Sequence, residues 1–195
     1  MSPTWDEVRT ALALRPPAQA ADEASKRAAV AVILRDGPGG IEVLFIRRAE
    51  QPQDPWSGQV AFPGGRAEPS DADLRATAVR ETREEIGVDL LESAEVLGTL
   101  DEVRAVARGL PMNLTIAPFV FRLRDPFEPA LSMEVRSVHW LPLGDLLGTT
   151  RRSTMDYAQQ GVSLQLPCLR VDELVIWGLT YRMFMSFQER LGVGA

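Results

Sequence analysis

Residues 64–88 constrain the fold and the chemistry of this chain more than any other stretch. They read GGRAEPSDADLRATAVRETREEIGV: a pair of glycines, a polar segment, and a run rich in Ala, Leu, Arg and Glu that stops at Gly87. Glycine pairs mark turns, and a glycine commonly ends a helix. The pattern therefore predicts a turn followed by a helix. Val79 and Ile86 share one side of that helix and are expected to anchor it in a core.

Three glutamates of this helix gather on another side. Glu81, Glu84 and Glu85 fall within an arc of roughly 100° at 3.6 residues per turn. Like charges this close repel one another and weaken a helix, so their grouping favours the binding of a cation. Oxygen ligands suit a hard ion such as Mg²⁺, which typically links protein carboxylates to substrate phosphates. The alternative is a solvated helix face with Arg–Glu pairs, such as Arg80 with Glu84.

The same stretch resembles a known family signature. Arg80–Val88 (RETREEIGV), preceded by the glycine pair, resembles the Nudix box of hydrolases that cleave a nucleoside diphosphate linked to another group. The box is one residue longer than usual. Together with residues 57–63 (SGQVAFP) and the arginine-bearing segment 43–48 (VLFIRR), it resembles the Nudix branch that hydrolyses coenzyme A. The resemblance covers most of residues 28–190.

The resemblance implies a fold, a cofactor and a reaction. The fold is of the α+β class, a Nudix-type α/β/α sandwich with a mixed β-sheet. The chain then divides into an N-terminal helix and linker, residues 1–27, and a Nudix hydrolase domain, residues 28–195. The implied activity is that of a pyrophosphatase, a hydrolase acting on phosphorus-containing anhydrides, with Mg²⁺ or Mn²⁺ as cofactor. The expected substrate is coenzyme A, cleaved to 3′,5′-ADP and 4′-phosphopantetheine.

Two alternatives stay open. The branch that cleaves coenzyme A often has a histidine near the position of Trp56, so the substrate can instead be a nucleotide sugar, a dinucleotide polyphosphate or a nucleoside triphosphate. The chain can also be a non-catalytic Nudix module that binds a nucleotide. Loss of box glutamates would mark such a module, and here Glu81, Glu84 and Glu85 are all present.

Metal ligands are expected at both ends of the 64–88 stretch. Glu81 and Glu85, one turn apart, are the first candidates, with Glu84 as the third. A backbone carbonyl at Gly64 or Gly65 can complete the set, because glycine lets the main chain approach a ligand closely. The expected chemistry is metal-assisted attack of water on a phosphorus of the diphosphate.

The general base is not fixed by the sequence. Glu81 or Glu84 can serve if water on the metal is deprotonated nearby. In Nudix enzymes the base can also come from a loop outside the box, and Glu134, at the start of a predicted strand, resembles such a position; a solvent-facing glutamate is the competing interpretation. His139, the single histidine, is interpreted as structural.

Arginines are the candidate contacts to the substrate. Arg80 is expected to orient a glutamate. Arg47 and Arg48 end a predicted strand, and since side chains alternate, only one of them should face a given side of the sheet; that one can bind phosphate, and a surface role is the competing interpretation. The candidate substrate-binding residues are therefore Arg47, Arg48, Gly64, Gly65 and Arg80. Further candidates for the 3′-phosphate of coenzyme A are Arg104, Arg108, Arg151 and Arg152, and Trp56 is a candidate for stacking on adenine.

Composition excludes several other classes. A chain of 195 residues with 45% hydrophobic residues is typical of one globular domain with an adequate core. A net charge of −6 argues against a nucleic-acid partner, whose binding surface carries a basic patch. Cys168 is the single cysteine, so the cytoplasm is the expected compartment. No apolar run is long enough for a membrane span. The expected partner is a small-molecule nucleotide substrate, and the family resemblance allows a homodimer.

The remaining elements follow from capping and periodicity. Thr4, with Glu7 three residues later, predicts a capped helix to Leu14. The predicted strands are 28–34, 41–46, 59–62, 94–99, 114–123 and 135–140, and the predicted helices are 142–147 and 179–191. Residues 18–27 are expected to form a linker, 100–113 a loop, and 149–170 an irregular hairpin around Gly161.

Overall fold

The structure is a computed structural model that describes residues 2–20, 26–52, 54, 56–107, 110–159 and 162–192. The helices in this part of the chain are α1 (Trp5–Ala13), α2 (Leu74–Ile86), α3 (Leu90–Ser93), α4 (Leu143–Leu147) and α5 (Gly178–Arg190). The strands are β1 (Lys26–Gly37), β2 (Gly40–Arg48), β3 (Val60–Ala61), β4 (Gly64–Arg66), β5 (Ala94–Thr99), β6 (Val103–Ala107), β7 (Leu110–Leu123), β8 (Val135–Pro142), β9 (Arg152–Gln159), β10 (Val162–Val171) and β11 (Leu174–Trp177). Residues 21–25 of the predicted linker, Arg108 and Gly161 lie outside the described residues.

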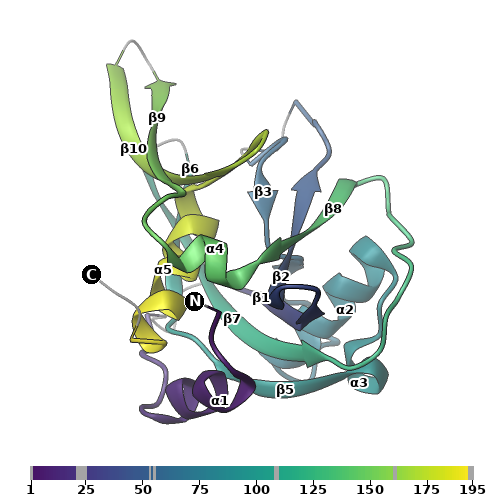
Figure 1. The fold of residues 1–195 in the computed structure, drawn as a ribbon. Helices are drawn as coiled ribbons and strands as arrows, with labels where there is room; N and C mark the ends of the chain where they lie inside the picture. The colour runs from purple at the N-terminus through teal and green to yellow at the C-terminus, as the bar shows by residue number, and fades with distance from the viewer. Residues whose placement is uncertain are drawn as a thin grey trace.

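A mixed sheet forms the middle layer of the molecule (Figure 1). Strand β1 lies at its centre, antiparallel to β2 and β4 and parallel to β7. Strands β3 and β8 pair with β2, while β5 and β6 pair with β7. A smaller antiparallel sheet, in the order β11-β10-β9, extends beyond one end of it.

Helices cover both faces of the mixed sheet. Side chains alternate along a strand, so Val32 of β1 packs in one core cluster with Val8 of α1 and Phe184 of α5. Its neighbour Ile33 packs in the other cluster with Val79 of α2. The predicted α+β class and α/β/α sandwich are confirmed.

Helix α2 has the ends that its sequence predicts. The Asp73 side chain caps its first turn by accepting a hydrogen bond from the N–H of Ala76 at 2.7 Å. Its C-terminus is Gly87, which adopts the left-handed conformation with φ 78°. Val79 and Ile86 are buried and fix the helix on the sheet.

The N-terminal helix packs on the same core. Thr4 and Glu7 form the predicted capping box before α1. Val8 and Leu12 are buried among residues of the sheet. Residues 1–27 therefore include a helix that contacts the rest of the chain, and the division at residue 28 stays a prediction.

Two predicted loops contain strands. The glycine pair expected to form a turn begins β4, in which Gly64 lies opposite Val30 of β1. The predicted loop 100–113 contains β6, which pairs antiparallel with β7. Arginines in this segment suggest a loop, but Val103 is buried beside an exposed Arg104, the alternation of a strand.

The region after α4 is more regular than predicted. Strands β9 and β10 pair without a register shift from Arg152 opposite Leu169 to Gln159 opposite Val162, so the expected irregular hairpin is wrong in that respect. The short helix α3, capped by Asp89, was also absent from the sequence prediction. No helix in the described part of the chain combines the length and the apolarity needed to cross a membrane.

Candidate active site

The three box glutamates have different environments on α2. The side chain of Glu84 is 59% exposed, that of Glu81 is 18% exposed and that of Glu85 is 5% exposed. Gly64 of β4 donates its N–H to Glu85 Oε2 at 2.9 Å. A Cβ atom added to Gly65 would overlap the carboxylate of Glu81, so the Gly65 backbone lies directly beside that group. The glycines thus bring bare main chain against the acidic face of the helix.

Burial perturbs two of these carboxylates. It raises the pKa of Glu85 to about 7, although the Gly64 N–H and the Arg48 guanidinium, 3.8 Å away, favour the charged form. Burial also raises the pKa of Glu81, with Arg80 opposing the shift. A nearby positive charge stabilises the ionised form of such desolvated carboxylates.

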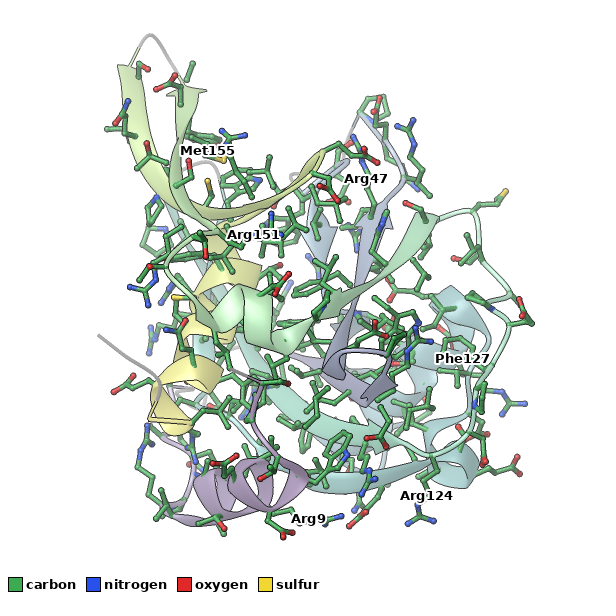
Figure 2. All side chains as sticks on the ribbon, in the orientation of Figure 1. Arg9, Arg47, Arg124, Phe127, Arg151 and Met155 are labelled. Atoms are coloured by element: carbon green, nitrogen blue, oxygen red, sulfur yellow. The ribbon has the colours of Figure 1, made fainter. Side chains whose placement is uncertain are left out.

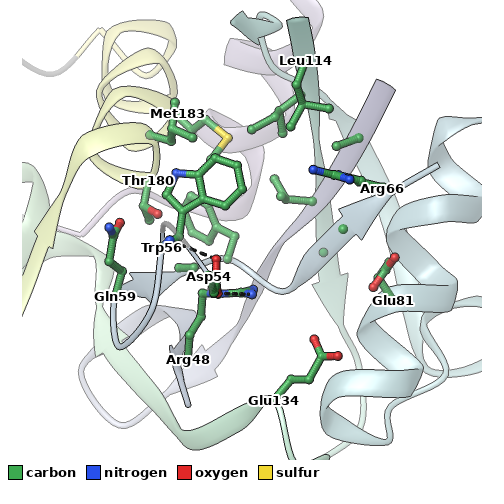
Figure 3. Close-up of a pocket in the computed structure, with 18 of the residues that line it drawn as sticks. Arg48, Asp54, Trp56, Gln59, Arg66, Glu81, Leu114, Glu134, Thr180 and Met183 are labelled. Atoms are coloured by element: carbon green, nitrogen blue, oxygen red, sulfur yellow. Dashed lines mark hydrogen bonds and ion pairs between the residues drawn. The ribbon is translucent and has the colours of Figure 1, made fainter. Parts of the chain in front are cut away.

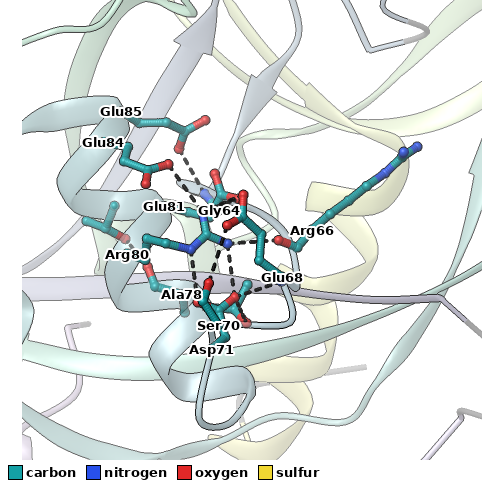
Figure 4. A network of polar contacts seen from close by, with 12 residues as sticks. Gly64, Arg66, Glu68, Ser70, Asp71, Ala78, Arg80, Glu81, Glu84 and Glu85 are labelled. Carbon is teal, nitrogen blue, oxygen red and sulfur yellow. Dashed lines mark hydrogen bonds and ion pairs between the residues drawn. The ribbon is translucent and has the colours of Figure 1, made fainter.

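Arg80 links the helix to the loop before it (Figure 4). Its Nε and Nη2 donate to the two oxygens of Asp71 at 2.9 and 3.0 Å. Nη2 also donates to the Arg66 carbonyl oxygen at 2.9 Å, and Nη1 donates to Glu81 at 3.0 Å and to Glu84 at 3.2 Å. These contacts raise the pKa of Arg80 above its usual range and hold the pKa of Asp71 well below its own.

A cavity of about 440 Å³, called the main cavity below, opens beside these carboxylates (Figure 3). Its polar lining comprises Arg48, Asp54, Gln59, Arg66, Glu68, Arg80, Glu81, Glu84, Glu134 and Thr180. Its apolar lining includes Ala28, Val30, Trp56, Phe62, Leu114, Ile116, Leu179 and Met183. The cavity therefore joins an acidic end to an apolar wall that contains an indole ring.

Arg48 and Trp56 are held by one carboxylate. Asp54 Oδ2 accepts hydrogen bonds from Arg48 Nε at 3.0 Å and Nη2 at 2.8 Å. Asp54 Oδ1 accepts from the backbone N–H of Trp56 at 2.9 Å. The loop after β2 thus places an arginine and an indole on the same cavity (Figure 3).

Glu134 faces the helix glutamates from the opposite side. Figure 3 shows it directed toward the same space as Glu81. Its carbonyl oxygen accepts a hydrogen bond from the N–H of Ala49 at 2.8 Å, which fixes the segment before β8. A second cavity of about 240 Å³ is lined by Glu81, Glu84, Glu85, Ser132, Met133 and Glu134. The carboxylate of a loop residue and those of α2 therefore share one acidic space.

Comparison with known proteins identifies the family. A model of the NUDIX domain matches residues 25–160, more than half of the chain. The chain belongs to the Nudix family. The match includes α2, β4 and Glu134, the parts that bring the carboxylates together.

Curated relatives agree with this assignment. The Nudix hydrolase NudL of Citrobacter koseri is 31% identical over 165 residues, covering 84% of this chain and 81% of NudL. The peroxisomal coenzyme A diphosphatase ndx-8 of Caenorhabditis elegans is 38% identical over 130 residues, covering 65% of this chain and 53% of ndx-8. A Schizosaccharomyces pombe protein is 43% identical over 112 residues, which are 54% of this chain. The chain spans a third of that protein and about half of ndx-8.

Solved Nudix structures share the fold. An Ap4A hydrolase of Caenorhabditis elegans, solved as a binary complex, superposes with a TM-score of 0.52 at 26% identity, covering 63% of this chain and 83% of the hydrolase. A MutT/nudix family protein of Enterococcus faecalis gives a TM-score of 0.55 at 15% identity, covering 98% of this chain and 76% of that protein.

Several sequence candidates lie away from the Nudix carboxylates. Arg47 faces the side of β2 opposite to Arg48 and lines a separate cavity of about 260 Å³ with Glu173 and Trp177. Figure 2 shows Arg47 near the end of β2. His139 is half-buried on β8, with Nε2 2.8 Å from Ser137 Oγ, and burial lowers its pKa. The candidates Arg104, Arg151 and Arg152 are absent from the described lining of the main cavity.

The donor set of the Nudix box fits a hard cation in its chemistry. Glu81, Glu84 and Glu85 offer only oxygen atoms, and burial raises the pKa values of Glu81 and Glu85, so a cation beside them would stabilise their charged forms. Within the described residues, no three side chains of His, Cys, Asp or Glu already lie close enough together to coordinate an ion. Arg80 Nη1 instead bridges the carboxylates of Glu81 and Glu84.

The sequence did not predict the contacts of three residues of the site. Asp54, Arg66 and Asp71 lie in segments without regular periodicity, so their partners depend on the folded chain. Asp71 did have a local signal, because an aspartate before a helix commonly accepts backbone hydrogen bonds. It accepts one from the N–H of Glu68 at 2.9 Å. No sequence signal pairs Asp54 with Arg48, six residues earlier in an adjoining strand.

Proposed function

We propose that this chain is a divalent-metal-dependent Nudix pyrophosphatase that cleaves coenzyme A to 3′,5′-ADP and 4′-phosphopantetheine. The observation that carries the proposal is the main cavity, which joins the carboxylates of Glu81, Glu84 and Glu134 to an apolar wall with Trp56. A nucleoside diphosphate has the matching halves, since its phosphates need positive charge and its base needs an apolar, aromatic surface.

Each residue then has a role in the proposed reaction. Glu81, Glu84 and Glu85, with the Gly65 carbonyl, would hold Mg²⁺ or Mn²⁺. The bound ion supplies charge neutralisation for the diphosphate and increases the acidity of water. Arg80 holds the carboxylates of Glu81 and Glu84 in place.

Glu134 and Arg48 act from the other elements. We assign Glu134 as the general base because its carboxylate enters the shared acidic space from a loop outside α2. Glu81 and Glu84 remain the alternatives for this role. Arg48, on the same cavity and fixed by Asp54, is suited to bind a phosphate oxygen of the substrate.

Coenzyme A is supported by relatives and by sequence. The similarity to ndx-8, named as a coenzyme A diphosphatase, supports it, as does the motif at 57–63. A second candidate substrate is a dinucleoside polyphosphate, which the similarity to an Ap4A hydrolase structure favours. A nucleotide sugar and a nucleoside triphosphate stay as further alternatives, and so does a module that binds a nucleotide without turnover.

A direct assay separates these substrates. Purified protein is incubated with coenzyme A, ADP-ribose or Ap4A, with and without Mg²⁺ or Mn²⁺, and the products are resolved by chromatography. We expect 3′,5′-ADP to appear from coenzyme A only when the metal is present. If coenzyme A is untouched while another compound is cleaved, the substrate assignment fails. Tight nucleotide binding without any turnover would reject the enzyme assignment.

Two variants test the metal site. Glu81→Gln and Glu85→Gln keep the shape of the side chain but remove its charge, and each is expected to lower turnover at least tenfold, on the order of the loss expected for a group acting only in the transition state. Circular dichroism checks that both variants fold. Glu92→Gln is the matched control, since Glu92 is an exposed glutamate on α3 outside the site. Unchanged activity in both site variants would reject the assigned ligands.

We also propose a domain division, a compartment and an assembly. The family match begins at residue 25, which supports a Nudix domain from residue 28 and a separate N-terminal helix and linker.

The single, buried Cys168 supports the cytoplasm as the compartment. The peroxisome named for ndx-8 is the alternative, and imaging of a tagged chain will decide between them. Light scattering will distinguish a monomer from the homodimer that the family resemblance allows.

A further inference from the structure

Arginines in the main cavity differ in whether their guanidinium groups are engaged. Arg48 is held by Asp54, and Arg80 is held by Asp71, Glu81 and Glu84. Arg66 also lines the cavity, and its side chain has no hydrogen-bond or ion-pair partner among the described residues. Its carbonyl oxygen accepts from Arg80, but its guanidinium points away from that network (Figure 4). Arg66 is thus a positively charged side chain on the cavity wall that no described residue pairs with.

The position of Arg66 separates it from the acidic end. In β4 it lies opposite Ala28 of β1, so the two side chains share a face of the sheet. Ala28 belongs to the apolar wall, together with Leu114. Figure 3 shows the Arg66 guanidinium directed toward the part of the cavity that holds Trp56, while Glu81 lies on the opposite side of β4. The free charge therefore faces the wall that suits a base, away from the carboxylates.

We propose that Arg66 binds a phosphate on the nucleotide half of the substrate that is not cleaved, namely the 3′-phosphate of coenzyme A. The inference rests on the proposed function, and it assigns the residue that distinguishes coenzyme A from nucleotides without this phosphate. In the proposed function the diphosphate binds at the carboxylate end of the cavity. A positive charge at the apolar end is therefore suited to bind a second anionic group of the substrate. Arginine suits that group, because its planar donors match the oxygens of a phosphate.

Coenzyme A and 3′-dephospho-coenzyme A provide the test, because they differ only in this phosphate. The wild-type protein is expected to have the higher kcat/KM for coenzyme A. Arg66→Ala should lower kcat/KM for coenzyme A about tenfold or more, mainly by raising KM. Its kcat/KM for 3′-dephospho-coenzyme A should stay within about twofold of the wild-type value. Arg66→Lys should recover part of the preference, since it keeps the charge without the planar geometry.

Arg124→Ala is the matched control. Arg124 is another exposed arginine whose side chain makes no hydrogen bond or ion pair within 4 Å among the described residues, and Figure 2 shows it beside α3, far from Arg47 and the end of β2. It is absent from the described lining of the main cavity, so this variant should cleave both compounds like the wild type. Equal losses for the two compounds in Arg66→Ala, or no loss for either, would overturn the proposal.

A binding experiment separates this inference from the proposed function. Calorimetric titration compares adenosine 3′,5′-diphosphate with AMP in the presence of Mg²⁺, without any turnover. The wild type should bind the 3′,5′-diphosphate more tightly, and Arg66→Ala should remove that difference. If the wild type cleaves neither coenzyme A nor its dephospho form, the proposed function fails, while the titration still decides the role of Arg66. Equal affinities of the wild type for the two ligands would reject it.

Discussion

Arg80 and Asp71 form the most extensive ion pair of the site, with Nε and Nη2 of the arginine 2.9 and 3.0 Å from the two carboxylate oxygens. The Asp71 side chain is only 6% exposed, and it also accepts hydrogen bonds from the Glu68 N–H and the Thr77 hydroxyl, each at 2.9 Å. One buried carboxylate therefore fixes both the loop before α2 and the arginine that bridges Glu81 and Glu84.

Asp71→Ala should damage both stability and activity. It leaves Arg80 and two further donors without their acceptor, so we expect the free energy of unfolding to fall by about 2–4 kcal/mol. At a temperature where the variant is folded, kcat/KM should still fall about tenfold, because Arg80 no longer holds the glutamates. Asp73→Ala, which removes the helix cap and an exposed contact to Arg75, should cost about 1 kcal/mol and keep the activity. Denaturant melts and initial rates measure the two effects; an Asp71→Ala protein with wild-type stability would contradict the role given to the pair.

Gly64→Ala is expected to disrupt the junction between β4 and α2. An added Cβ would overlap the Ala29 carbonyl oxygen and lie 2.6 Å from Val30 Cα, both of them backbone atoms in the central strand. Relief of the clash must move β4 and lengthen the bond from the Gly64 N–H to Glu85. We expect a loss of about 2 kcal/mol or more in the free energy of unfolding.

Gly39→Ala is the control for this substitution, because nothing lies within 4 Å of a Cβ at Gly39. Its unfolding midpoint in urea should match that of the wild type, whereas Gly64→Ala should unfold at a lower concentration. Equal midpoints for the two variants would show that the close packing of β4 on β1 does not restrict residue 64.

Asp101 should make the stability of the fold depend on pH. Hydrogen bonds from Arg15 and the Ala18 N–H, together with Arg190, hold the pKa of Asp101 well below its usual range. A lowered folded-state pKa stabilises the protein above the unfolded-state pKa, and this contribution is lost as the pH falls below about 4.

Asp101→Asn tests this dependence. Arg190 has a side chain that is 1% exposed, so the loss of its carboxylate partner should lower the free energy of unfolding at pH 7 by about 2–4 kcal/mol. Below pH 4 the gap between the wild type and the variant should narrow progressively, because the unfolded wild-type chain takes up a proton on Asp101 that the folded protein still resists. Urea melts from pH 3 to pH 7 measure both curves, and a constant gap between them would count against the assignment.

Trp56→Phe and Trp56→Ala should differ in substrate binding. The buried Nε1 of Trp56 has no hydrogen-bond partner among the described residues, so phenylalanine loses no such bond and should change stability by less than about 1 kcal/mol. Phenylalanine also keeps an aromatic face, and its KM should stay within about threefold of the wild-type value. Alanine removes the ring from the cavity wall and should raise KM about tenfold. Steady-state kinetics with coenzyme A decide the matter, and a normal KM for Trp56→Ala would exclude the ring from the binding site.

The sequence predicted the parts of the fold that depend on local signals. Helix α2 could be predicted without its N-terminal cap, Asp73. Gly87 indicated where the helix ends, and the apolar positions Val79 and Ile86 indicated which side is buried. The alternation of Arg47 and Arg48 also predicted that only one of them faces the α2 side of the sheet, and Arg48 does so.

What the sequence missed depends on contacts between distant segments. β4 reads as a turn because glycines mark turns, yet Gly64 and Gly65 extend along β1, where the absence of side chains permits close approach to the main chain and to Glu81. The pairing of Asp54 with Arg48 and the free guanidinium of Arg66 are consequences of packing, and no periodic pattern encodes them.

Asp54 has a consequence for any attempt to redesign this pocket. Its two oxygens bind the guanidinium of Arg48 and the backbone N–H of Trp56, so one carboxylate orients both groups. Replacing the loop to admit a different base would also remove the acceptor of the Arg48 guanidinium, which we propose to bind phosphate. A redesigned loop that moves Trp56 therefore needs a new acceptor for Arg48.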